Sequence, residues 1–141
     1  MKYEYRVLYP ADAYGRFLKR PLIEIDITGP RGKMKELALI DSGADRSLFH
    51  QEIAEMLGID LSTAQYRRTI GITGAMDVAY TEVQITLEQT GASIKIPVGF
   101  IDSPYVSVLL GQEGFFDQHT ILFERGQNSF SITPLTHPGA A

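Results

Sequence analysis

The chain contains no cysteine among its 141 residues. This absence excludes disulfide bonds, thiolate metal sites and cysteine nucleophiles together. A chain without cysteine also fits a reducing compartment. We therefore look elsewhere for chemistry, among carboxylates, hydroxyls and imidazoles.

The sequence also lacks long apolar runs and blocks of one charge. Charges interrupt the N-terminal Met-Lys-Tyr-Glu-Tyr-Arg, and no apolar stretch follows that could act as a signal peptide or membrane span. We expect a soluble, cytoplasmic protein with no membrane segment in this chain. The net charge is −4 and no basic block is present, so nucleic acid is not an expected partner.

The composition is that of an ordinary globular protein, with 44% hydrophobic and 10% aromatic residues. Domain boundaries, internal repeats and low-complexity segments are not recognisable. We expect a single domain over residues 1–141, with a core at about 20–133 and a loose tail at 134–141. Thirteen glycines and seven prolines indicate many tight turns.

Apolar and polar residues alternate along most of the chain, which predicts β-strands. The sequence Gly29-Pro30-Arg31-Gly32 predicts a turn between the second and third of them, and Gly91 predicts another. The strands are expected at residues 2–9, 22–28, 33–40, 67–72, 78–87, 93–101, 106–110, 121–123 and 130–132.

A helical period appears once, over residues 48–57. Its apolar face consists of Phe49, Ile53, Met56 and Leu57. Ser47 is the predicted N-cap, and Gly58 is predicted to follow the last turn. A shorter helical turn is expected at residues 112–118, which gives a mostly β domain with one or two short helices.

The most informative stretch is an apolar run that ends in a carboxylate. Residues 37–40, Leu-Ala-Leu-Ile, are apolar on both faces, as in a central buried strand. Asp41 follows at once, so the buried strand holds its backbone at the edge of the core. Gly43 permits a sharp turn and the close approach of another chain, and Ser42 supplies a hydroxyl that can hydrogen-bond there.

Asp41-Ser42-Gly43-Ala44 resembles the D-[ST]-G-A active-site motif of retropepsin-like aspartic proteases. Three further features follow in the order that this family shows. They are a helix-like segment, a glycine-bearing hairpin at the place of the family's flap (Gly71-Ile72-Thr73-Gly74-Ala75), and an apolar run before glycine (Val108-Leu109-Leu110-Gly111). The resemblance covers roughly residues 20–123 and is more specific than Asp-Ser-Gly alone.

The resemblance implies a closed, β-barrel-like acid-protease fold and an aspartic endopeptidase. It makes Asp41 the catalytic residue and Ser42, Gly43 and Ala44 the active-site loop. The residues implied to bind substrate are Asp45, Gly71, Ile72, Thr73, Gly74 and Ala75. Leu110 and Gly111 are implied to support the site, and neither a metal nor an organic cofactor is implied.

Aspartic protease chemistry needs two carboxyl groups that share one proton. The sequence contains a single Asp-Ser/Thr-Gly, at 41–43, and is too short for two lobes. The second carboxylate must therefore come from Asp41 of a two-fold mate, which predicts a homodimer that binds a peptide or protein substrate.

Several alternatives stay open at this point. The fold could serve a dimeric peptide- or protein-binding domain that cleaves little, or a protease that needs another partner. Gly71-x-x-Gly74 also fits a nucleic-acid clamp, but that clamp lies between helices. A serine hydrolase would need a G-x-S-x-G elbow, which is absent. The three histidines have no metal spacing and are expected at the surface, and Asp45 could instead cap the following helix.

Overall fold

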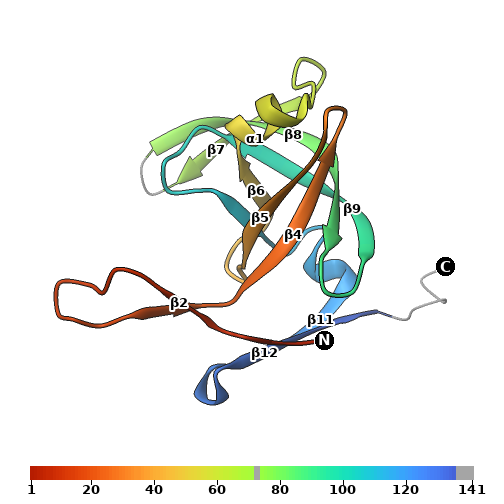
Figure 1. Cartoon of the computed structure of the whole chain (residues 1–141). Coiled ribbons are helices and arrows are strands. Elements are labelled where there is room, and N and C mark those ends of the chain that lie inside the picture. Colours follow the sequence, from red (N-terminus) through yellow and green to blue (C-terminus); the bar gives the residue numbers. More distant parts are fainter. Residues whose placement is uncertain (72–73, 136–141) are drawn as a thin grey trace.

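The computed structural model of the chain describes residues 1–71 and 74–135 (Figure 1). The fold is mostly β, as the sequence predicted, and strands β4 to β10 form one sheet. These strands are β4 (Leu22–Gly29), β5 (Gly32–Ile40), β6 (Ser47–His50), β7 (Gln65–Gly71), β8 (Gly74–Leu87), β9 (Ala92–Ile101) and β10 (Val108–Leu110).

Six of these strands close into a barrel. The order of hydrogen-bonded neighbours is β4-β5-β10-β6-β9-β8, and β8 pairs again with β4. Because both edges of β4 are paired, the sheet has no open edge there. The alternation in β4 buries Ile23, Ile25 and Ile27 inside the barrel, and each buried side chain contributes roughly 1.5–3 kcal/mol to stability.

The predicted hairpin and the later strands are confirmed. Gly29 pairs with Gly32 across the two-residue turn between β4 and β5. Gly32 has φ +128° and Gly91 has φ +68°, conformations that favour glycine at both turns. The expected helical turn at 112–118 contains a 3₁₀ turn, η1 (Phe116–Gln118).

The predicted helix begins later than the periodicity indicated. Helix α1 spans Gln51–Leu57, and its N-cap is His50, whose Nδ1 accepts a hydrogen bond from the Glu52 backbone N–H at 3.1 Å. Gly58 ends the helix at φ +69°, as predicted.

The N-cap prediction for Ser47 is wrong because residues 47–50 form strand β6. This strand lies between β10, to which it runs antiparallel, and β9, to which it runs parallel. Pairing on both sides satisfies backbone groups that a helix would otherwise satisfy, and it buries Phe49 in the barrel.

The predicted strand at residues 2–9 is divided into two. Strand β1 (Lys2–Glu4) pairs with β12 (Ser129–Pro134), and Tyr3 stacks on Phe130 with ring centroids 5.3 Å apart. Strand β2 (Arg6–Leu8) leaves the body and pairs with β3 (Leu18–Arg20). We call residues 6–20 the arm.

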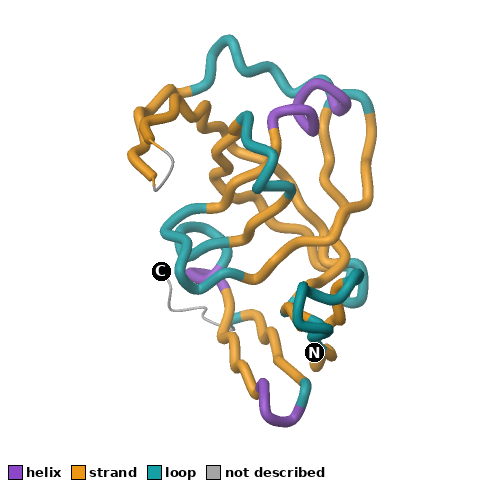
Figure 2. Tube along the Cα trace, turned by 90° about the vertical axis from the view of Figure 1, so that its left-hand side faces the viewer, coloured by secondary structure: helices purple, strands orange, loops and turns teal. Residues whose placement is uncertain are grey.

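A smaller sheet has the order β1-β12-β11, where β11 spans His119–Glu124. The β11–β12 hairpin, with the 3₁₀ turn η2 (Arg125–Gln127), extends away from the barrel (Figure 2). Strand β12 ends at Pro134, and residues 136–141 lie outside the described residues. The loose tail and the single domain therefore stay predictions.

Candidate active site

The two apolar runs that the sequence singled out end side by side. Strands β5 and β10 are parallel neighbours, with Leu110 opposite Ile40. The next residue in each chain segment is Asp41 after β5 and Gly111 after β10. The Asp41 backbone N–H donates to the Leu110 carbonyl at 3.0 Å, so the two strand ends are joined where the carboxylate begins.

Asp41 starts a tight turn over residues 41–46. From here on, the name active-site loop, which the resemblance gave to Ser42, Gly43 and Ala44, covers all six of these residues. The Asp41 Oδ1 accepts a hydrogen bond from the Gly43 backbone N–H at 2.9 Å, and its carbonyl accepts from the Ala44 N–H at 3.2 Å. Both bonds fix the backbone and the rotamer of Asp41. The carboxylate is half-buried, whereas Ser42 and Gly43 are exposed beside it.

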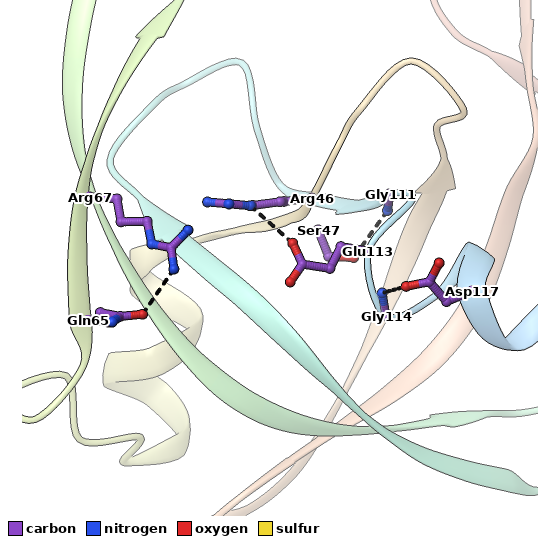
Figure 3. Close-up of polar contacts among 8 residues, drawn as sticks. All are labelled: Arg46, Ser47, Gln65, Arg67, Gly111, Glu113, Gly114 and Asp117. Carbon is purple, nitrogen blue, oxygen red and sulfur yellow. Dashed lines mark hydrogen bonds and ion pairs between the residues drawn. The ribbon is translucent and has the colours of Figure 1, made fainter. Parts of the chain in front are cut away.

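Gly111 lets the segment after β10 approach this loop. A Cβ at Gly111 would lie 2.6 Å from the carbonyl oxygens of both Ala44 and Arg46, so no side chain fits. The Gly111 N–H donates to the Ser47 Oγ at 3.1 Å, and Ser47 is fully buried (Figure 3). The sequence analysis missed Ser47, since a serine before a helical period is typical of an N-cap.

The two residues that follow Gly111 also contact the active-site loop. The Gln112 N–H donates to the Ala44 carbonyl and the Glu113 N–H to the Asp45 carbonyl, both at 2.9 Å. The Gln112 side-chain amide also donates to the Ser42 carbonyl at 2.8 Å. The active-site loop is therefore held along its length by a segment about seventy residues later in the chain.

The far end of the active-site loop contacts the β7–β8 hairpin. The Arg46 guanidinium forms an ion pair with Glu113 at 3.1 Å and lies 5.0 Å from the centre of the Tyr80 ring. Arg67 of β7 lies 5.8 Å from the same ring (Figure 3 shows Arg46, Arg67 and Glu113). Contact with Tyr80 and then with Glu113 raises the pKa of Arg46, so its charge is retained.

The predicted flap residues lie at the end of this hairpin. Gly71 ends β7, Gly74 begins β8, and the two are paired; Ala75 follows in β8. Ile72 and Thr73 lie outside the described residues. The hairpin is thus confirmed, while its role as a flap stays a prediction. Asp45 is exposed next to the loop.

A hollow of about 300 Å³ opens beside the carboxylate. It is broad and shallow, and it lies between the active-site loop, the start of β4 and the β11–β12 hairpin. Its lining residues are Arg20, Pro21, Leu39, Ile40, Asp41, Ser42 and Phe123. Asp41 therefore lines an open hollow at the surface of this chain.

Other kinds of site find little support in residues 1–71 and 74–135. Within those ranges no group of three or more His, Asp or Glu residues could hold a metal ion. Among the same residues, none of the helices combines the length and apolar character needed to cross a bilayer. The expected surface position is wrong for His119, which is buried with its Nδ1 2.7 Å from the Phe115 carbonyl oxygen.

The model of a protein family described as aspartyl protease matches residues 24–113, more than half of the chain. That segment contains Asp41, the β7–β8 hairpin and Gly111, the elements that the structure brings to this region. No curated protein matches the chain in sequence. The chain belongs to an aspartyl protease family of the retropepsin-like type.

Proposed function

We propose that the chain is an aspartic endopeptidase that works as a homodimer, with a water activated between the two Asp41 carboxylates. One observation carries the proposal. Asp41 is presented at the rim of the barrel on a loop held from both sides, yet it is only half-buried and lines an open hollow. A carboxylate that is fixed but accessible is what a shared catalytic pair requires.

The chemistry follows from two like charges placed a few ångströms apart. One carboxyl group retains a proton while the other is ionised, and the two pKa values belong to the pair. The ionised partner accepts a proton from the water as it attacks the peptide carbonyl. The protonated partner donates to the carbonyl oxygen as that oxygen becomes tetrahedral.

The substrate would lie as an extended strand between the active-site loop and the β7–β8 hairpin. Backbone hydrogen bonds give such binding its affinity, and side-chain pockets give it specificity. We assign Gly71 to Ala75 to the flap that closes over the peptide, and Ala44 and Asp45 to its other side. Ser42 and Gly43 shape the turn, and Leu110 and Gly111 support it.

The deciding experiment is cleavage of a peptide library, read by mass spectrometry from acidic to neutral pH. We expect wild-type protein to cleave and Asp41→Asn to lose the activity, because the amide cannot share a proton as a carboxyl does. Asp60→Asn, which changes an exposed carboxylate that accepts from the Ser62 N–H, is the matched control and should cleave normally.

Cleavage that survives in Asp41→Asn would contradict the mechanism. A well-folded wild-type dimer that cleaves nothing would favour the alternative, a dimeric binding domain with the same fold.

A further inference from the structure

The arm is the part of the molecule that the proposed chemistry does not use. Strands β2 and β3 form a two-stranded sheet of their own, and the arm projects from the body (Figure 1). An isolated two-stranded hairpin is at best marginally stable in water. The arm therefore gains stability if another surface packs against it.

The end of the arm is an ordered turn. The Asp12 Oδ1 accepts hydrogen bonds from the backbone N–H groups of Tyr14 and Arg16, both at 2.9 Å. The Asp12 N–H donates to the Arg16 carbonyl at 2.7 Å, and Gly15 takes a φ of +76° in the same turn. A turn with this much internal bonding is organised before it binds anything, which reduces the entropy cost of binding.

Apolar and aromatic side chains are concentrated on the arm. Tyr9, Tyr14 and Phe17 are 77%, 82% and 51% exposed, and the rings of Tyr9 and Phe17 lie 5.2 Å apart. Val7, Leu8 and Leu18 are exposed on the same hairpin. Single exposed hydrophobic residues are common, but six of them on one fifteen-residue hairpin indicate an interaction surface.

The charge of the arm is opposite to that of the rest of the chain. Residues 6–20 carry four basic residues and one acidic residue, whereas the remaining residues carry nine basic and sixteen acidic ones. The body of a second copy of this chain therefore has a net charge opposite to that of the arm.

The arm also leaves the body beside Asp41. The Pro21 carbonyl accepts a hydrogen bond from the Ile40 N–H at 3.0 Å, one residue before the carboxylate. Arg20 and Pro21 line the same hollow as Asp41. From this base the arm extends on the side of the molecule where β7 lies (Figure 1).

We propose that the arm is a dimer clasp, which docks its aromatic and basic side chains on the negatively charged body of a second copy of this chain. The inference rests on the proposed homodimer, because two Asp41 residues at a two-fold axis place the base of each arm next to that axis. Two-fold symmetry then makes the contact reciprocal, with each arm on its partner.

The test measures dimerisation in full-length Asp41→Asn protein, so that cleavage plays no part. Sedimentation over a range of concentrations compares this protein with a variant that adds Tyr9→Ser and Phe17→Ser. We expect the dimer Kd to rise about tenfold or more. Met56→Ser is the matched control, because Met56 is 62% exposed on α1, at the other end of the body (Figure 1), and should leave Kd unchanged.

Cross-linking locates the contact directly. The chain has no cysteine, so Ala13→Cys gives a single attachment point for a benzophenone label at the end of the arm. We expect light to produce a covalent product of twice the chain mass.

Equal Kd values for the arm variant and the control, or cross-links confined to one chain, would overturn the clasp. A monomeric chain whose arm binds a fluorescent oligonucleotide would also overturn it. None of these results requires cleavage. The first two leave a dimer without the clasp, so wild-type protein can still hydrolyse peptides while Asp41→Asn does not, whereas a monomeric chain would also overturn the proposed homodimer.

Discussion

Gly111 lies where the backbone of the active-site loop leaves no room for a side chain. Its absent Cβ would sit 2.6 Å from two carbonyl oxygens, and both belong to backbone that cannot rotate away. The resemblance implied that Gly111 supports the site, and this lack of room for a side chain gives the physical reason. Substitution must move either the loop that holds Asp41 or the end of β10.

We expect Gly111→Ala to lower the free energy of unfolding by about 1–3 kcal/mol, the usual cost of overpacking, and to reduce peptide cleavage strongly. Gly126→Ala is the matched control, because a Cβ there meets nothing within 4 Å. Urea denaturation at one fixed chain concentration measures the effect, since dimerisation adds to apparent stability. An unchanged urea midpoint for Gly111→Ala would contradict this prediction, because it would show that the loop can move without a loss of stability.

Tyr3 makes the stability of the folded protein depend on pH in the alkaline range. Burial raises the pKa of its phenol, so the folded state holds this proton more tightly than the unfolded chain. The stabilisation is fully present below the unfolded pKa of about 10 and is lost as the pH rises through the folded value.

We therefore expect wild-type protein to lose more stability than Tyr3→Phe between about pH 9 and pH 11. Tyr105→Phe, at a residue that is 85% exposed, serves as the control and should follow the wild type. Thermal melts across this range measure the difference. Parallel curves for wild type and Tyr3→Phe would argue against the docking of β1 on β12.

At the scale of elements, sequence pattern predicted the strands whose neighbours are close in the chain. Ile23, Ile25 and Ile27 alternate because one face of β4 lines the barrel, and the turn at Gly29 sets the register with β5. Residues 47–50 were mispredicted because their strand exists only through β9 and β10, whose paired residues come about fifty and sixty residues later.

The same contrast between local pattern and distant partners explains which site residues were predicted from the sequence and which were missed. Asp41 and Gly111 were identified from motifs, and the structure places their strands side by side. The contributions of Ser47 and Gln112 were missed, because each bonds to a backbone group 64 or 70 residues away. Backbone partners leave no pattern in residue types, so only the folded chain reveals them.

Tyr80 joins two elements that would both contact substrate. Its ring lies against guanidinium groups from the active-site loop and from β7. The ring fits because a Cβ at Gly99 would lie only 2.7 Å from it, and glycine leaves that space open.

We expect Tyr80→Leu to cost about 0.5–1 kcal/mol of stability through the lost cation–π contacts. We also expect it to raise KM more than it lowers kcat, because the hairpin is no longer tied to the loop. Tyr66→Leu is the control on the same hairpin, since Tyr66 is 61% exposed. Steady-state kinetics on one peptide decides the point, and equal KM values for the two variants would refute the coupling.

At the scale of the whole molecule, the proposed mechanism makes activity a property of two chains, because each chain contains a single Asp-Ser-Gly. A mixed dimer of one wild-type and one Asp41→Asn subunit has only one catalytic carboxyl group, so it should be inactive. Activity after subunit exchange should therefore fall with the square of the wild-type fraction, whereas independent monomers would give a linear fall.

With one part wild type and nine parts Asp41→Asn, random pairing in two-fold dimers leaves about one hundredth of the activity per total chain. Separate active monomers would leave about one tenth. The measurement is an initial rate on one peptide after the mixture has exchanged at low concentration and been reconcentrated. A Gly126→Ala variant in place of Asp41→Asn controls for mixing, since its dimers should all cleave. A linear fall would place the complete catalytic apparatus in one chain and refute the shared pair of Asp41 carboxyl groups.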